Sequence, residues 1–225
     1  MSVSRINTGR FVERLCFVYN NPHMATKIKI FPSDSGYDLA AARYDEKESY
    51  LNSFEKNHVF DLLGDLSGKK VLDVGAGTGR LTLELSQRGA LVTALDVSGK
   101  MLQVLTRNNP RIEIKIGDAE DLPFADNTFD IVVAAFLIVH LKDLTRFFDE
   151  AYRVLKDGGK LLVTNINQKE PPEIKTKEGV IKIESYYHRP EKVREILEQL
   201  AFGIGKEVFV KVKDVWVNQI VLAIK

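Results

Sequence analysis

The residues with the clearest chemical capacity form a glycine-rich turn at positions 75–79 (GAGTG) of this 225-residue sequence. The turn follows an apolar segment, residues 71–74, and precedes a segment in which Leu81 and Leu85 have helical spacing. Glycines permit positive φ and let a ligand approach the backbone closely. The first N–H groups of a helix are unpaired and favour an anion. We therefore predict a site at this strand–helix junction for a ligand with an anionic group.

The spacing of the glycines separates two classes of ligand. A dinucleotide fingerprint, G-x-G-x-x-G, would put its third glycine at position 80, where this chain has Arg80. The third glycine is instead Gly79, and the bulky Arg80 side chain weakens the dinucleotide interpretation. The carboxylate of an amino-acid moiety needs less room than a pyrophosphate, so it suits this turn better.

A second chemical feature is Asp96, which ends the next apolar segment, 17 residues after Gly79. A carboxylate at that place can accept hydrogen bonds from both ribose hydroxyls of an adenosine ligand. Taken alone, an aspartate at a strand end is usually a helix cap, and Ser98 could share that task. Together with the glycine turn, Asp96 favours an adenosine ligand.

Two histidines are candidates for general acid–base work. His140 follows the expected fourth strand at its carboxyl end, where open α/β sheets bind ligands, although it could equally cap the next helix. His188 follows the expected fifth strand, with Tyr187 beside it and Pro190 after it, and could instead pack at the start of a helix. Phe136, His140, Tyr187 and His188 are the candidate substrate-binding residues, because all follow the carboxyl ends of strands.

Apolar periodicity places these residues on alternating strands and helices. The predicted strands are residues 70–74, 90–95, 112–116, 129–136 and 160–164, and the predicted helices are residues 46–63, 80–88, 98–108 and 144–155. After an extended stretch at 173–187 comes a helix from Pro190 to Leu200, and then strands at 208–212 and 215–224 joined at Lys213 and Asp214. This order predicts an α/β fold with a doubly wound parallel sheet, ending in an antiparallel hairpin at one sheet edge.

Composition excludes several classes of function. Lys plus Arg number 32 against 31 Asp plus Glu, a net charge of +1, which is not the footprint of a general nucleic-acid binder. The single cysteine, Cys16, excludes an internal disulfide and a cysteine-cluster metal site, and indicates a reducing, cytoplasmic compartment. The longest apolar run, residues 131–141, is about half of the roughly 20 residues that span a bilayer. We expect no metal, nucleic-acid or membrane partner.

From Tyr37 to Thr164 the sequence resembles the class I S-adenosylmethionine-dependent methyltransferases, and in particular the small-molecule branch with the ubiquinone and menaquinone biosynthetic enzymes. The matching strings are residues 71–79 (VLDVGAGTG), 94–98 (ALDVS), 117–124 (GDAEDLPF), 129–132 (FDIV) and 150–159 (EAYRVLKDGG). Five matches in one order over roughly 130 residues are far more specific than a glycine motif alone. The resemblance implies a Rossmann-like sheet of seven strands whose last pair is the antiparallel hairpin.

The resemblance also implies S-adenosylmethionine as cofactor and a role for each matching residue. Asp73, Gly75, Ala76 and Gly77 would line its methionine end, and Asp96 would hold the ribose. Val97 and Met101 would lie against the adenine, Asp118 would accept from the adenine amino group, and Ala119 would donate a backbone N–H. Ala134, Ala135 and Phe136 would border the sulfonium. Tyr44 resembles part of the family's lid, although an aromatic anchor of the first helix would look the same.

The expected reaction is methyl transfer to a small molecule by in-line displacement, in which positioning supplies most of the acceleration. A base is needed only if the nucleophile arrives protonated, which would be the work of His140 or His188. The alternatives are a non-catalytic S-adenosylmethionine-binding sensor or scaffold and an NAD-type oxidoreductase. We expect residues 1–33 to be a leader of uncertain origin and residues 34–225 a single domain, with residues 170–188 covering the substrate.

Overall fold

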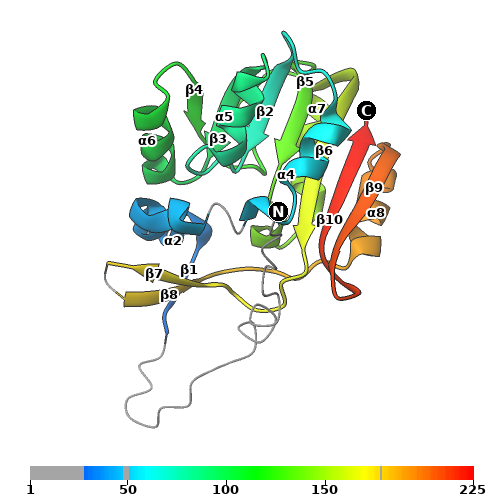
Figure 1. Ribbon diagram of the computed structural model, residues 1–225. Helices are drawn as coiled ribbons and strands as arrows, with labels where there is room; N and C mark the ends of the chain where they lie inside the picture. Colours follow the sequence, from blue (N-terminus) through cyan, green and yellow to red (C-terminus); the bar gives the residue numbers. More distant parts are fainter. Residues whose placement is uncertain (1–27, 48–50, 178) are drawn as a thin grey trace, which may run out of the picture.

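Seven strands form the central sheet of the computed structural model, which describes residues 28–47, 51–177 and 179–225. Their order across the sheet is β4-β3-β2-β5-β6-β10-β9. The strands are β2 (Lys70–Val74), β3 (Leu91–Asp96), β4 (Glu113–Ile116), β5 (Phe129–Ala134), β6 (Leu155–Ile166), β9 (Gly203–Val212) and β10 (Val215–Ile224). Neighbours pair in parallel except β10, which is antiparallel to both β6 and β9. The predicted doubly wound sheet with a reversed terminal hairpin is confirmed (Figure 1).

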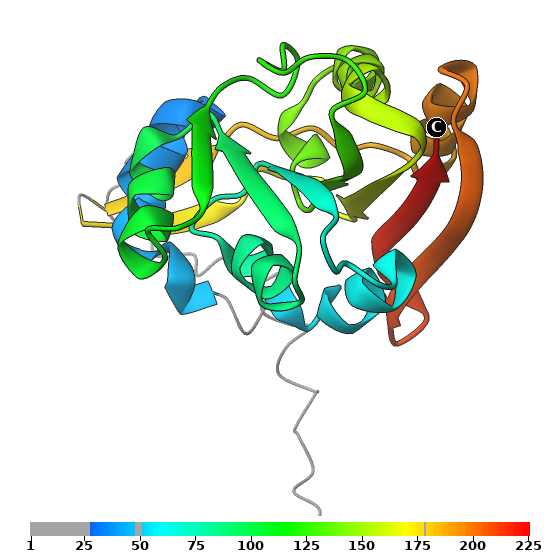
Figure 2. The ribbon, with the colours of Figure 1, turned by 90° about the horizontal axis from the view of Figure 1, so that it is seen from above.

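Helices cover both faces of this sheet, as Figure 2 shows from above. On one face, α4 (Lys56–Leu63) and α5 (Arg80–Gln87) pack against Val71 and Ile131. On the other, α7 (Leu144–Val154) and α8 (Pro190–Gln199) pack against Leu72 and Val132. Successive strand residues point to opposite faces, so an apolar strand such as β2 contributes to both cores.

Two local predictions need correction. The helix expected at 46–63 is not continuous: residues 41–47 form a 3-10 helix, η1 (Ala41–Lys47), and α4 begins only at Lys56. Before it, the N–H groups of Phe54 and Glu55 donate to the carbonyls three residues earlier, in a turn rather than a helix. The predicted positions 48–50 lie outside the described residues.

The second correction concerns the glycines after α7. The helix already ends at Val154, and the strand predicted at 160–164 begins at Leu155 and runs through Gly158 and Gly159. Gly158 has φ of 72°, and the pairing of β5 with β6 shifts register at this point. The strand continues through the irregularity because Gly158 donates to the Lys225 carbonyl and Lys225 donates to the Gly159 carbonyl, each at 3.0 Å.

The extended stretch near residue 180 forms a second, smaller sheet. Strands β7 (Glu173–Thr176) and β8 (Gly179–Ile183) are antiparallel, and β1 (Ile30–Phe31) adds to β8 in parallel. Its buried side chains, Ile174, Ile181 and Ile183, pack with α2 (Ser33–Ala40). Part of the segment expected to be a leader thus pairs with the expected substrate cover.

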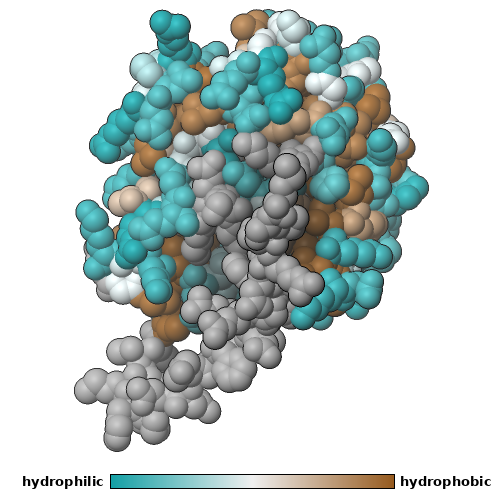
Figure 3. Space-filling model, in the orientation of Figure 1, coloured by the Kyte–Doolittle hydropathy of each residue, from teal (hydrophilic) through white to brown (hydrophobic). Residues whose placement is uncertain are grey.

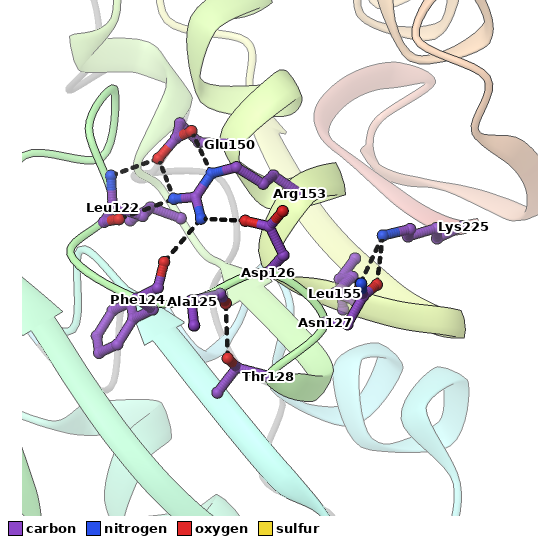
Figure 4. A network of polar contacts seen from close by, with 10 residues as sticks. All are labelled: Leu122, Phe124, Ala125, Asp126, Asn127, Thr128, Glu150, Arg153, Leu155 and Lys225. Carbon is purple, nitrogen blue, oxygen red and sulfur yellow. Dashed lines mark hydrogen bonds and ion pairs between the residues drawn. The ribbon is translucent and has the colours of Figure 1, made fainter.

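Arg153 on α7 fixes the loop between β4 and β5, which carries part of the ligand site (Figure 4). Its guanidinium donates to the carbonyls of Leu122 at 2.9 Å and Phe124 at 2.7 Å, and pairs with Asp126 at 2.9 Å. Glu150 accepts from Arg153 and also from the Leu122 N–H, at 2.7 Å. The Arg153 side chain therefore satisfies two backbone carbonyls of this loop and holds the loop to α7.

The described surface is mixed in polarity. The most exposed large apolar side chains lie on four different strands: Ile30, Leu91, Ile116 and Val215. Figure 3 shows apolar atoms interrupted by hydrophilic ones on the face seen in Figure 1. No helix in the described part of the chain has the length and apolar character to span a bilayer.

The glycine turn offers a test of close packing. Gly79 (φ 97°) and Gly68 (φ 68°) both have left-handed backbones, which cost an alanine about 1–2 kcal/mol. Only at Gly79 would a Cβ meet another residue, lying 2.3 Å from Leu105 Cδ1, whereas nothing lies within 4 Å at Gly68. We expect Gly79→Ala to lose about 1–3 kcal/mol more unfolding free energy than Gly68→Ala, because the buried Leu105 must move. Urea unfolding of both variants measures the difference, and equal losses would contradict it.

Candidate active site

A cavity lies where the carboxyl ends of β2, β3 and β5 meet, and we call it the first cavity. It brings together ten of the predicted cofactor residues: Tyr44, Gly75, Gly77, Asp96, Val97, Met101, Asp118, Ala119, Ala135 and Phe136. It also contains residues to which the sequence analysis gave no role: Ser33, Tyr37, Leu95, Gly117, Glu120, Leu137 and Leu141. Leu95, Gly117 and Glu120 lie within the matching strings, and the signal for Leu137 and Leu141 was their position beside the predicted Phe136 and His140.

The glycine turn is shaped by positive backbone angles and by β3. Gly75 and Gly77 have φ of 73° and 57°, and the N–H groups of Gly75 and Ala76 donate to the Leu95 carbonyl at 2.8 and 3.0 Å. A Cβ at Gly75 would lie 3.0 Å from Leu137 and one at Gly77 would lie 3.3 Å from Met101. Side chains at these positions would fill the space that a ligand needs beside the backbone.

Asp96 is a buried carboxylate with both oxygens already oriented. Its Oδ2 accepts the Gly77 N–H and its Oδ1 accepts the Ser98 N–H, both at 2.8 Å. Burial raises the pKa of Asp96, and these N–H donors act in the opposite direction. Ser98 itself caps helix α6 (Gly99–Asn108), accepting from the Met101 N–H, so Asp96 is not needed as the cap. Each carboxylate oxygen retains a lone pair, which suits a pair of neighbouring hydroxyl groups.

Asp118 and Ala119 face this carboxylate from the loop after β4. The Gly117 N–H donates to the Asp96 carbonyl at 3.1 Å, which holds the loop to the end of β3. Asp118 Oδ1 accepts the Glu120 N–H at 2.9 Å, which orients the carboxylate. Val97 is 42% exposed and Met101 is buried, so the first cavity has an apolar side near these polar groups. Such a slot suits a flat heterocycle with polar edges.

Three predicted cofactor residues, Asp73, Ala76 and Ala134, are not among the residues that line the first cavity. Asp73 is buried at the end of β2, and its Oδ2 accepts the Thr82 hydroxyl of α5 at 2.6 Å. Burial raises the pKa of Asp73 to about 6, although Thr82 and Arg80 both act to lower it. In this structure Asp73 therefore joins β2 to α5 behind the glycine turn.

Phe136 is held in an unusual backbone conformation between the glycine turn and β6. Its φ is 55°, which is uncommon for a bulky residue, and its N–H donates to the Thr164 hydroxyl at 2.9 Å. The Arg80 guanidinium lies 5.4 Å from the ring centre and forms an ion pair with the buried Glu55. Burial raises the pKa of Glu55, while Arg80 lowers it. Strain of this kind is typical of functional positions.

A second cavity of about 510 Å³ adjoins the first, and the two share Tyr37, Tyr44, Phe136 and His140. This volume falls within the range of about 300–1,000 Å³ that is usual for small-molecule sites. The remaining lining is largely apolar, with polar groups from residues 167–170: Leu51, Phe54, Val139, Ile166, Asn167, Gln168, Lys169, Glu170, Pro172, Ile174 and Val217.

His140 and Tyr37 are joined at the boundary of the two cavities. The Tyr37 hydroxyl lies 2.7 Å from His140 Nε2, and His140 Nδ1 lies 2.8 Å from the Glu184 carbonyl. Burial lowers the pKa of His140 and raises that of Tyr37. Tyr44 packs edge-on against Tyr37, with ring centres 5.7 Å apart, and burial raises the pKa of Tyr44 to about 12. The sequence analysis gave roles to Tyr44 and His140, but it gave none to Tyr37.

The structure does not bring Tyr187 or His188 to either cavity. His188 Nε2 lies 3.0 Å from the Ile138 carbonyl and 2.9 Å from the Leu141 carbonyl, so its ring ties the chain after β8 to the segment after β5. Tyr187 is 38% exposed, with the Lys169 ammonium 5.9 Å from its ring centre. Among the described residues there is no group of three His, Cys, Asp or Glu side chains that could hold a metal ion.

Comparison with known proteins agrees with this arrangement. Residues 72–163 match the family model described as a methyltransferase domain. The demethylmenaquinone methyltransferase of Renibacterium salmoninarum is 38% identical over 135 residues, covering 58% of this chain and 57% of the relative. The ubiquinone/menaquinone biosynthesis C-methyltransferase of Cereibacter sphaeroides is 32% identical over 148 residues, covering 60% and 59%. The chain thus spans somewhat over half the length of these relatives.

A solved structure, an S-adenosylmethionine-dependent methyltransferase from Aquifex aeolicus, shares the fold with a TM-score of 0.63 at 24% identity, covering 85% of this chain and 97% of that one. The sheet order therefore agrees with the fold of S-adenosylmethionine-dependent methyltransferases, and residues 72–163, which begin just before the glycine turn, match a methyltransferase domain. Both sequence relatives are named for methylation in menaquinone or ubiquinone biosynthesis.

The buried Asp73 carboxyl predicts a pH-dependent stability. Because burial raises its pKa from 3.8 to about 6, the folded state takes up this proton before the unfolded state does as the pH falls. The charged form therefore costs stability above pH 6, and the cost disappears toward pH 4. Asp73→Asn removes the charge and retains an acceptor for Thr82, so we expect it to be up to about 3 kcal/mol more stable than the parent near neutral pH. Urea unfolding at several pH values checks this, and an equal advantage near pH 4 would contradict it.

Proposed function

We propose that this protein transfers a methyl group from S-adenosylmethionine to a small aromatic acceptor of the quinol type. One observation carries the proposal: the first cavity has the groups for the cofactor, and the second cavity, sharing Tyr37, Tyr44, Phe136 and His140 with it, has the size and lining for an apolar acceptor. Acceptor and cofactor would then meet at this shared wall, where positioning can supply most of the rate acceleration.

The residues of the first cavity fit the parts of the cofactor. The oriented oxygens of Asp96 suit the two ribose hydroxyls, and the open backbone of the glycine turn suits the methionine end. We assign Gly75, Gly77 and Tyr44 to the methionine end, Asp96 to the ribose, Val97, Met101, Asp118 and Ala119 to the adenine, and Ala135 and Phe136 to the sulfonium. When bound, the cofactor supplies a methyl group already activated for displacement.

The second cavity supports a quinol-type acceptor. Aromatic and aliphatic side chains form most of its wall, and residues 167–170 provide polar groups at one part of it. Pro172 and Ile174 of the stretch 170–188 line this cavity, which supports our assignment of that stretch as a substrate cover. Both sequence relatives are named for reactions of quinone biosynthesis, in agreement with such an acceptor. We also propose that residues 34–225 act as a single domain.

Neither alternative function has comparable support. A sensor needs a cofactor site alone, and the adjoining acceptor-sized cavity favours catalysis over sensing. An NAD site would need room for a pyrophosphate beside a third glycine at position 80. This chain has Arg80 there, and its guanidinium forms an ion pair with Glu55 and lies over the Phe136 ring.

The cofactor assignment predicts the effect of removing the Asp96 carboxylate. Asp96→Ala loses the two acceptors for the ribose hydroxyls, and hydrogen bonds to a charged group are worth about 1.5–3 kcal/mol each. We expect the affinity for S-adenosylhomocysteine to fall about 100-fold or more by calorimetry. Asp61→Ala, which removes an exposed carboxylate of α4, is the control and should bind as the parent does. Binding of NAD in place of S-adenosylhomocysteine would favour the oxidoreductase.

The acceptor assignment predicts a separate effect in the second cavity. Ile166 lines that cavity and not the first, so Ile166→Trp should fill acceptor space without touching the cofactor residues. With methyl-labelled S-adenosylmethionine and 1,4-dihydroxynaphthalene, we expect kcat/KM for the acceptor to fall about tenfold or more. The affinity for S-adenosylhomocysteine should not change. A parent protein that binds the cofactor but methylates no hydroxylated aromatic compound would support the sensor function.

A further inference from the structure

We infer that Tyr37 and His140 form a proton relay that ionises a hydroxyl group of the acceptor, an inference that rests on the proposed function. The two side chains come from α2 and from the 3-10 helix η2 (Ile138–His140), 103 residues apart, and both line both cavities. Their hydrogen bond of 2.7 Å lies at the wall where acceptor and cofactor would meet.

The Glu184 carbonyl fixes the direction of the relay. A carbonyl oxygen only accepts, so the 2.8 Å contact places the proton of neutral His140 on Nδ1. The Nε2 lone pair therefore faces Tyr37, whose hydroxyl donates to it. The phenolic oxygen of Tyr37 then has lone pairs left to accept a hydrogen bond from a ligand. Both side chains are half-buried, which limits the access of bulk water to the pair.

The proton step balances without any further reactant. The acceptor hydroxyl gives its proton to the Tyr37 oxygen as Tyr37 gives its own proton to His140 Nε2, leaving an acceptor oxyanion, a neutral tyrosine and an imidazolium. The electron pair of the oxyanion, through oxygen or through a conjugated ring carbon, forms the bond to the methyl carbon, and the carbon–sulfur pair stays on sulfur. If oxygen attacks, His140 later releases its proton to solvent. If carbon attacks, that carbon loses its own proton to solvent, and the oxygen takes one back from His140 through Tyr37.

Among the titratable groups near Tyr37, we assign His140 as the base because its Nε2 contacts the Tyr37 hydroxyl directly. The carboxyl of Glu184 accepts from the Tyr186 hydroxyl at 2.7 Å, so only its backbone carbonyl serves His140. The other titratable groups at the two cavities are Tyr44, Asp96, Asp118, Glu120, Lys169 and Glu170. Burial lowers the pKa of His140, so its imidazole is neutral and able to accept a proton at physiological pH.

Three variants test the relay with 1,4-dihydroxynaphthalene as the acceptor. Tyr37→Phe removes only the hydroxyl, and His140→Gln retains an acceptor for it but cannot take up the proton. We expect kcat to fall about 100-fold or more in both variants, with unchanged affinity for S-adenosylhomocysteine by calorimetry. His58→Gln is the matched control, because this exposed histidine of α4 lines neither cavity, and its kcat should match the parent's.

An acceptor that is already ionised separates base catalysis from packing. The nitro group of 4-nitro-1-naphthol makes its hydroxyl acidic, so this compound should need no relay. The loss in Tyr37→Phe and His140→Gln should then shrink to less than about tenfold. Equal losses with both acceptors would overturn the relay and indicate a structural role.

The pH profile gives a further readout. Parent kcat with 1,4-dihydroxynaphthalene should fall as the pH drops through the lowered pKa of His140, below 6.5, and this acid limb should vanish in His140→Gln. Variants with parent kcat would overturn the relay alone. A parent that methylates neither naphthol, while binding S-adenosylhomocysteine, would overturn both the relay and the proposed function.

Discussion

The end of β3 holds the glycine turn through backbone donors. The Leu95 carbonyl accepts from Gly75 and Ala76, and the Asp96 carboxylate accepts from Gly77. These bonds form at the positive φ angles of the turn, and they hold Gly75 and Gly77 at the wall of the first cavity. The rest of the site is arranged around this junction, because the Asp96 carbonyl also accepts from Gly117 and thereby holds the loop after β4.

Burial of titratable groups gives the site its electrostatic character. Burial favours the neutral forms of Asp73, Tyr37, Tyr44 and His140, and their hydrogen-bond partners determine which atoms carry the protons. The exception is the Glu55–Arg80 pair, in which a buried carboxylate has an oppositely charged partner.

The chain that follows the small sheet is bound to the segment that carries His140. The Glu184 carbonyl binds His140, the Tyr186 N–H donates to the Val139 carbonyl at 2.7 Å, and His188 binds two further carbonyls of the same segment. The stretch after β8 is thus attached to the segment after β5 by three neighbouring residues. The position of the stretch after β8 and the orientation of the His140 ring are therefore coupled, so a movement of that stretch would turn the ring.

The sequence by itself determined the sheet, the glycine turn and most of the first cavity. These features depend on local patterns: apolar periods mark strands and helices, and the carboxyl ends of parallel strands must meet at one edge. Gly75, Gly77, Asp96 and Asp118 each follow or end a strand, so their convergence followed from topology alone. Only the tertiary structure decided the partners of His140, the role of Tyr37 and the displacement of His188 from the cavities. His140 contacts Tyr37, 103 positions away in the sequence, and Glu184, 44 positions away. These contacts depend on how α2 and the small sheet pack, and a local pattern of apolar residues carries no information about that packing.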